Sequence, residues 1–219
     1  RSQFKASPHH SPMPAPPTHP DTPDLVAPDL VALVASRLCH DLISPLGAIG
    51  NGVELLSLSG SAGAEIDLIA QSVAQANARL RLFRIAFGAA GDGHTVPAAE
   101  LTSLASGLSR QGRISFDWQA GGASRAEAKL ALLAVLCAES ALVHGGRITV
   151  AQNGTWTVRA EGPKLRADPD LWGRLDAGAR AGADIAPAHV QFALLAAEAA
   201  RQRRQLAFGL AETEVALSF

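Results

Sequence analysis

Two consecutive heptad patterns of apolar residues constrain the fold of this chain more than any other feature. The first runs from about residue 28 to residue 57, with apolar positions at alternating steps of four and three: Val31, Ala35, Leu38, Leu42, Ile49 and Leu56, with Pro45 and Gly52 in the two intervening slots. The second runs from about residue 64 to residue 87: Ile66, Ile69, Val73, Ala76, Leu80, Phe83 and Phe87. Both predict long helices, because such a repeat places its apolar residues on one helical face.

The break between the two patterns contains Gly60 and Gly63 and is short enough to join the helices as an antiparallel hairpin. One hairpin cannot cover the apolar stripes of both helices, whereas two hairpins can pair into a four-helix bundle. We therefore expect residues 24–90 to form a helical hairpin domain that dimerises, which makes the protein a homodimer.

Proline dominates the start of the chain, where eight of the thirteen prolines fall within residues 1–28. Such a segment propagates neither a helix nor a sheet, so we expect residues 1–23 to be an unstructured tail. We interpret residues 1–12 as an expression-vector remnant that precedes a natural start at Met13, although Met13 can also be an internal residue.

Composition excludes several classes of protein. Apolar residues make up 47% of the 219, and the net charge is −1, so the chain has material for a core and no general attraction to nucleic acid or anionic membranes. It lacks a run of about 18 uninterrupted apolar residues, and we expect no membrane span. Its two cysteines, Cys39 and Cys137, lie in helical patterns, which favours a reducing cytoplasmic location.

After Gly93 the pattern changes from heptads to alternating strands and shorter helices. We expect helices at 97–110, 124–143, 168–175 and 187–203, and strands near 114–118, 148–150, 156–158, 206–210 and 215–219. The Ser124–Glu127 spacing is a capping box, and Asn153-Gly154 marks a tight turn between two strands. Residues 94–219 are therefore predicted to be an α+β domain with helices packed on a mainly antiparallel sheet.

The most informative residue of the first helix is His40. At 100° per residue, His40 falls on the side opposite the Leu38/Leu42 seam, so we expect it to point into solvent. Small or polar residues share this outer face and permit close approach of another protein. The residues that we assign to partner binding are Arg37, Ser44, Gly47 and Asn51.

A neutral imidazole is a good nucleophile near pH 7 and can attack an activated phosphate to give phosphohistidine. The adjacent Asp41 can hold the other ring nitrogen in its protonated state and so fix the tautomer. We therefore predict catalytic roles for His40 and Asp41. The alternative is an exposed His-Asp pair without function.

The segment from Leu38 to Pro45 reads LCHDLISP and contains His-Asp-x-x-x-Pro, which resembles the phosphoacceptor box of two-component histidine kinases. The run continues with Gly47-Ala48-Ile49, Asn51-Gly52 and Glu54-Leu55-Leu56, and as a whole it is most similar to the ChpT-type histidine phosphotransferase family of alphaproteobacteria. The resemblance continues weakly through Ala160–Pro163 and Pro187–Gln191, and it covers roughly residues 24–219.

This resemblance implies a phosphorelay shuttle in cell-cycle signalling. His40 would take a phosphoryl group from the receiver domain of a hybrid histidine kinase and pass it to the receiver domains of response regulators. The receivers would supply the aspartates and Mg²⁺, so we expect no cofactor and no metal on this chain. Residues 94–219 would then be a degenerate histidine-kinase ATP-binding domain, an α/β sandwich.

Two alternatives are an ATP-dependent sensor histidine kinase core and a non-catalytic kinase-like dimeric scaffold. A kinase would carry an asparagine, a magnesium ligand, within Leu132–Leu142, and this segment has none. Its only charge, Glu139, can replace that ligand, but we interpret it as solvated. The glycine boxes are also broken, since Gly162 precedes a proline and three residues separate Gly178 from Gly182.

We likewise expect two arginine groups to be solvated, although the first can meet an acidic receiver: Arg79, Arg81 and Arg84, and Arg201, Arg203 and Arg204.

Overall fold

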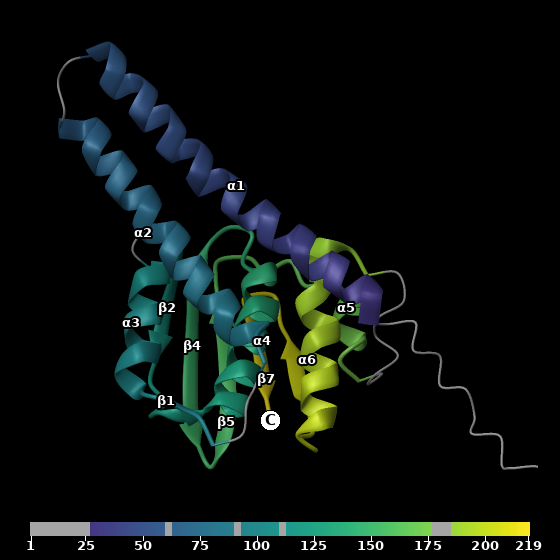
Figure 1. Ribbon diagram of the computed structural model, residues 1–219. Coiled ribbons are helices and arrows are strands. Elements are labelled where there is room, and N and C mark those ends of the chain that lie inside the picture. Colours follow the sequence, from purple (N-terminus) through teal and green to yellow (C-terminus); the bar gives the residue numbers. More distant parts are fainter. Residues whose placement is uncertain (1–26, 60–62, 90–92, 110–112, 177–184) are drawn as a thin grey trace, which may run out of the picture.

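The computed structural model describes residues 27–59, 63–89, 93–109, 113–176 and 185–219 (Figure 1). The predicted tail at residues 1–23 and the glycines at 178 and 182 lie outside the described residues. What remains is a long helical hairpin resting on a mixed α/β domain.

Helices α1 (Ala27–Ser59) and α2 (Gly63–Ala86) form the predicted antiparallel hairpin. Helix α1 continues through Pro45, which is buried. Gly52 of α1 is buried against α2, where an added Cβ would lie 2.6 Å from Cγ1 of Ile69. A larger residue at position 52 would require Ile69 to shift, and Gly52, which occupies one of the two non-apolar slots of the first heptad pattern, is therefore a packing position between the two helices.

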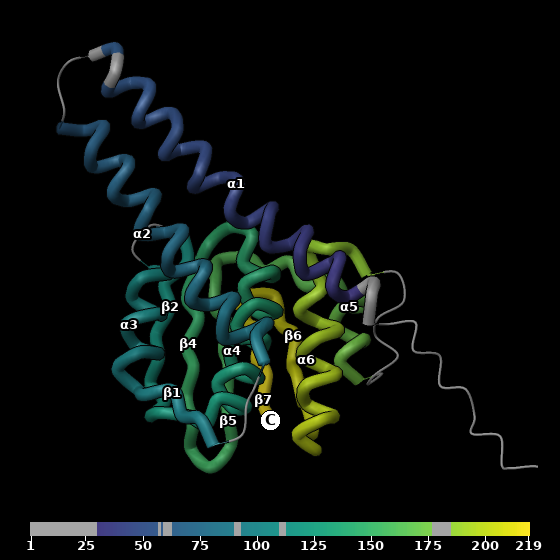
Figure 2. Tube along the Cα trace, in the orientation of Figure 1, coloured from purple at the N-terminus to yellow at the C-terminus, as the bar shows by residue number. Residues whose placement is uncertain are grey.

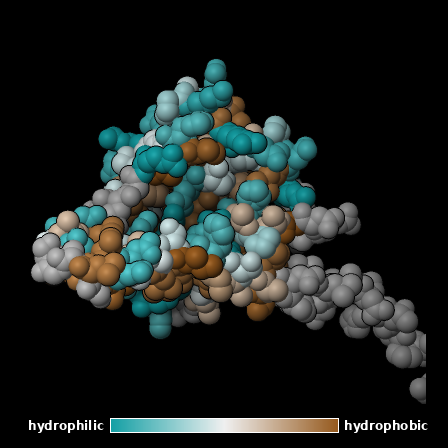
Figure 3. All heavy atoms as spheres, turned by 90° about the horizontal axis from the view of Figure 1, so that it is seen from above, coloured by the Kyte–Doolittle hydropathy of each residue, from teal (hydrophilic) through white to brown (hydrophobic). Residues whose placement is uncertain are grey.

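Three of the seven heptad positions of α2 are exposed within one chain. Ala76 and Phe83 are buried, whereas Ile66, Val73 and Leu80 keep 50%, 41% and 48% of their surface exposed. Ile43 and Leu46 on α1 are also exposed. Apolar side chains accordingly break the polar surface along the hairpin (Figure 3). The structure holds one chain, and the predicted four-helix bundle therefore stays a prediction.

The second domain contains a five-stranded sheet in the order β2-β4-β5-β7-β6. Strands β2 and β4 are parallel and the other three pairs are antiparallel, which confirms a mixed α+β fold with a mainly antiparallel sheet. Gly154 forms the predicted tight turn with φ +77°. The strand bounds are β2 Ile114–Trp118, β4 Gly146–Asn153, β5 Thr155–Glu161, β6 Ala207–Leu210 and β7 Glu214–Ser218. A small ribbon of β1 (Thr95–Val96) and β3 (Ala123–Ser124) was not predicted.

Helices cover one face of this sheet, and side chains on β5 alternate strictly between buried and exposed. Helix α4 (Arg125–Ala141) is the central core helix, with the predicted Ser124–Glu127 capping box at its start. Around it lie α3 (Ala98–Ser109), α5 (Pro169–Gly173) and α6 (Val190–Arg201), the last preceded by a 3₁₀ turn, Pro187–His189. The predicted final helix thus begins as a 3₁₀ turn.

The hairpin packs on the second domain through both of its helices. Helix α2 contacts α3 and α4, and the first half of α1 lies along α6 and the 3₁₀ turn. Figure 2 shows the loop end of the hairpin projecting beyond the second domain. The chain leaves α2 at Gly88, where an added Cβ would lie 2.3 Å from the Arg84 carbonyl oxygen.

Within the described residues, Leu30–Leu56 is long and apolar enough, with a mean hydropathy of 1.3, to cross a membrane by length and composition alone. Our sequence criterion, a run of about 18 uninterrupted apolar residues, was therefore too strict to exclude a membrane-spanning helix. The same segment contains Arg37 and Asp41, and its first half packs against the second domain, while only 6% of the apolar window is buried.

Candidate phosphoacceptor site

His40 lies on the outward face of α1, and 83% of its side chain is exposed to solvent. Ser44, Gly47 and Asn51 follow on the same face and are also exposed. An added Cβ at Gly47 would meet no atom within 4 Å, so the surface beside the imidazole is open. The structure thus brings together four of the predicted site residues on one face.

Asp41 turns toward the imidazole from the edge of the hairpin seam. Its Oδ1 lies 3.1 Å from Nδ1 of His40, and only 11% of the Asp41 side chain is exposed. A carboxylate oxygen at this distance can accept a hydrogen bond from Nδ1–H, and in a neutral imidazole with that tautomer Nε2 is the ring nitrogen that carries the free lone pair. The geometry suits a nucleophile whose second ring nitrogen is held by a fixed acceptor.

Arg37, which we assigned to partner binding, makes its contacts within the chain. Its Nε and Nη2 each lie 3.1 Å from Oδ2 of Asp41, and its Nη1 donates to the Ala188 carbonyl oxygen at 2.6 Å. Only 16% of the Arg37 side chain is exposed. Nothing in the sequence points to Ala188, because the contact uses a backbone carbonyl 151 residues away.

Glu139 is not the solvated residue that we predicted. Its carboxylate binds the guanidinium of Arg79, with 14% and 22% of the two side chains exposed, so the prediction of a solvated Arg79 was also wrong. Burial disfavours the charged form of Arg79, but the hydrogen bonds to Glu139 and the charges of Glu139 and Asp41 outweigh it and raise the arginine pKa. Helices α2 and α4 face each other here, and neither residue is free to meet a partner.

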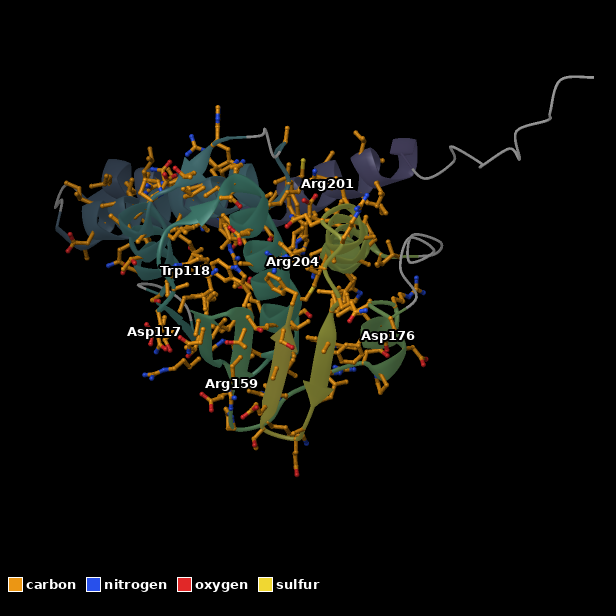
Figure 4. All side chains as sticks on the ribbon, turned by 90° about the horizontal axis from the view of Figure 1, so that it is seen from below. Asp117, Trp118, Arg159, Asp176, Arg201 and Arg204 are labelled. Atoms are coloured by element: carbon orange, nitrogen blue, oxygen red, sulfur yellow. The ribbon has the colours of Figure 1, made fainter. Side chains whose placement is uncertain are left out.

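The three arginines at and just after the end of α6 are exposed, as predicted, although two of them also have ion-pair partners. Arg201 binds Glu198 on its own helix, and Arg204 reaches Glu127 of α4 at 3.4 Å. Lys129 of α4 also lies 3.4 Å from Glu198. Figure 4 labels both arginines on the side of the domain where α6 lies against α4. Direct packing and ion pairs therefore join α6 and the residues that follow it to α4.

His40 stands on an exposed helical surface. A cavity of about 190 Å³ lies instead between α2, α3, α4 and β2, beside Arg79 and Glu139. Among the described residues, no three His, Cys, Asp or Glu side chains are grouped to hold a metal. Cys137 is fully buried, and burial raises the pKa of its thiol well above the ordinary value.

Comparison with known proteins agrees with this description. The family model of the histidine phosphotransferase C-terminal domain matches residues 98–214. The protein phosphotransferase ChpT of Brucella abortus is 37% identical over 153 residues, which is 66% of this chain and 73% of that protein. A solved bacterial phosphotransferase overlays with a TM-score of 0.75 and 30% identity, covering 89% of this chain and 97% of the other. A blue-light activated histidine kinase of Erythrobacter litoralis is less similar, with a TM-score of 0.40 and 14% identity over 83% of this chain and 59% of that chain.

The fold, the exposed histidine and the first three matches define the class as protein phosphotransferases. Within that class, the chain belongs to the ChpT-type histidine phosphotransferase family.

Proposed function

We propose that this protein is a phosphorelay shuttle in which His40 carries the phosphoryl group. In the accepting step, Nε2 of His40 forms a bond to phosphorus while the bond from phosphorus to a receiver aspartate oxygen breaks, and the bonding electron pair returns to that carboxylate. In the donating step, a second receiver aspartate attacks the phosphohistidine and the electron pair returns to Nε2. Each step conserves charge and needs no cofactor on this chain.

The observation that supports this proposal most strongly is the contrast between the two adjacent side chains. His40 is 83% exposed while Asp41 is 11% exposed, with 3.1 Å between Nδ1 and Oδ1. The nucleophile is thus accessible to a macromolecule while its tautomer is set from within the protein. Phosphoryl transfer depends mostly on such positioning and on charge neutralisation, which the receiver's Mg²⁺ would supply.

The partners that we propose are the receiver domain of a hybrid histidine kinase as donor and response-regulator receivers as acceptors, in cell-cycle signalling. The chain belongs to the same family as the Brucella protein phosphotransferase, and this supports receiver domains as the class of partner. We place this activity in the cytoplasm, without nucleic acid or membrane among the partners.

We also propose that the working form is a homodimer in which two hairpins make a four-helix bundle. Three apolar residues seven apart on α2, Ile66, Val73 and Leu80, form an exposed stripe, and Ile43 and Leu46 of α1 are exposed as well. A second hairpin with the same stripes would cover both.

ATP-dependent autophosphorylation is the main alternative, and nucleotide binding tests it. Two observations on α4 favour the shuttle over the kinase. The stretch Leu132–Ala138 is buried among apolar neighbours, and Glu139 pairs with Arg79. The alternative would need the Glu139 carboxylate as a substitute magnesium ligand, and that carboxylate binds Arg79. Calorimetric titration with Mg-ATP should show no binding at millimolar nucleotide, whereas tight binding would favour a kinase.

The direct test of the shuttle uses two receiver domains. A receiver loaded with labelled phosphate is mixed with the protein, excess donor is removed, and a second receiver is added. The label should pass to the protein as an acid-labile, base-stable adduct and then to the second receiver. A label that never leaves the first receiver, for all receivers of the source organism, would refute the proposal.

A further inference from the structure

We propose that Arg37 is a positioning residue for phosphoryl transfer: it holds the Asp41 carboxylate in place for His40 and anchors both to the second domain through the Ala188 carbonyl. This inference rests on the proposed function of His40. It differs from the role predicted from sequence, in which Arg37 contacts the partner protein.

The first argument is how the carboxylate oxygens of Asp41 are divided. Arg37 occupies Oδ2 with two nitrogens at 3.1 Å, while Oδ1 faces Nδ1 of His40 at the same distance. A guanidinium held against Oδ2 and a ring nitrogen against Oδ1 engage both oxygens of the carboxylate, which restricts its rotation more than either contact alone. Arg37 therefore determines where Oδ1 points and, through it, how the imidazole is turned.

The second argument is the contact made by Nη1, the third nitrogen of the Arg37 guanidinium. This nitrogen donates to the Ala188 carbonyl oxygen at 2.6 Å, within the 3₁₀ turn Pro187–His189 that opens α6. The arginine is thus fixed at both ends, to α1 and to the second domain. A lysine at this position has one ammonium group and cannot reproduce the planar fork that reaches both acceptors.

The third argument is the charge that develops on the ring during transfer. When Nε2 bonds to phosphorus while Nδ1 keeps its proton, the imidazole becomes cationic, and the Asp41 carboxylate at 3.1 Å stabilises that cation. A carboxylate free to rotate would lose part of this stabilisation. Outer groups that orient a reacting or ligating histidine typically contribute on the order of 10- to 100-fold.

The test measures transfer from receiver domains of the source organism, loaded with acetyl phosphate and Mg²⁺, to Arg37→Gln and Arg37→Lys variants of the full chain. We expect the saturating transfer rate to fall about tenfold in Arg37→Gln and less in Arg37→Lys, with the half-saturating receiver concentration unchanged. Nitrogen-15 NMR of His40 in the isolated protein should show the Nδ1–H tautomer in the wild type and a shift toward Nε2–H in Arg37→Gln.

A double-mutant comparison separates positioning from partner contact. Adding Arg37→Gln to Asp41→Asn should change the rate by less than twofold, because Arg37 acts through that carboxylate. A matched control, Arg84→Gln with Glu100→Gln, removes another ion pair between the hairpin and the second domain, at 3.4 Å, and should leave the tautomer unchanged. A wild-type rate and tautomer in Arg37→Gln, or an additive loss with a raised half-saturating concentration, would overturn the inference. Failure of the wild type to accept phosphate would refute the proposed function instead, and the NMR result would still stand.

Discussion

Arg79 on α2 binds Glu139 on α4 through both terminal nitrogens of its guanidinium, with 2.9 Å between Nη1 and Oε2. Both side chains are mostly buried, at the junction of the hairpin and the second domain. Together with the contact of Arg37 to the Ala188 carbonyl, this gives each helix of the hairpin an arginine bound to the second domain. The two domains are therefore held in one arrangement by polar contacts as well as by apolar packing.

Removing one partner of this ion pair should destabilise the protein. Arg79→Ala leaves the Glu139 carboxylate buried without its partner, and we expect the free energy of unfolding to fall by about 3 kcal/mol in urea titrations. Replacing both residues, with Arg79→Met and Glu139→Leu, should restore most of the loss, because two apolar side chains leave no uncompensated charge. A free energy of unfolding for Arg79→Ala within about 0.5 kcal/mol of the wild-type value would argue against a stabilising ion pair, because ordinary surface substitutions change stability by about that much.

The surface beside His40 should be the docking site for receivers. Gly47→Trp places a large side chain there without an internal clash, since an added Cβ at this position meets nothing within 4 Å. We expect it to reduce transfer from the donor receiver and to the acceptor receiver by at least tenfold, because both must reach the same nucleophile. Asn51→Arg should weaken both more mildly.

Gly209→Trp is the matched control for the docking surface, because Gly209 lies exposed on edge strand β6 and also has open space around it. It should transfer at the wild-type rate. Normal transfer in both directions by Gly47→Trp, with an unchanged oligomeric state, would show that partners approach His40 from another side.

Dimerisation should depend on the exposed stripe of α2. Light scattering at micromolar concentration should give twice the chain mass of 22.6 kDa for the wild type. Val73→Glu puts a charge into the proposed interface and should give monomers, whereas Gln71→Glu, at another exposed position of the same helix, should not. A monomeric wild type would contradict the bundle.

Acid should weaken the contact of α6 with α4. Burial raises the pKa of Glu198, but hydrogen bonds from Arg201 and Gln202 and the nearby charges outweigh it, so the pKa lies below its ordinary value of 4.5. A depressed carboxyl pKa contributes stability above that ordinary value, and the contribution is lost as the pH falls through the folded-state pKa. Glu198→Gln should therefore flatten the decline of unfolding free energy below about pH 4.5. Glu212→Gln, an exposed control, should not.

Much of the fold could be predicted from the sequence, because periodic patterns and local hydrogen bonds carry it. The heptads gave the two hairpin helices, and the Ser124–Glu127 spacing gave the capping box, which involves residues only three apart. The β1–β3 ribbon was missed, since two-residue strands have no periodicity to detect.

The candidate site divides in the same way. Helical geometry placed His40, Ser44, Gly47 and Asn51 on one exposed face, because all four lie on a single helix. The contacts of Arg79 with Glu139 and of Arg37 with Ala188 could not be predicted. They join residues 60 and 151 positions apart, and the second uses a carbonyl group that every residue possesses.

The central claim is that His40 carries the phosphoryl group, and site mapping after transfer tests it most directly. The wild type and a His40→Ala variant are incubated with the same phosphorylated receiver, and the modified residue is identified by mass spectrometry under alkaline conditions. The account predicts one phosphohistidine at position 40 in the wild type and no label on a folded His40→Ala protein. Undiminished labelling of His40→Ala, or a phosphate mapped to another residue in the wild type, would contradict it.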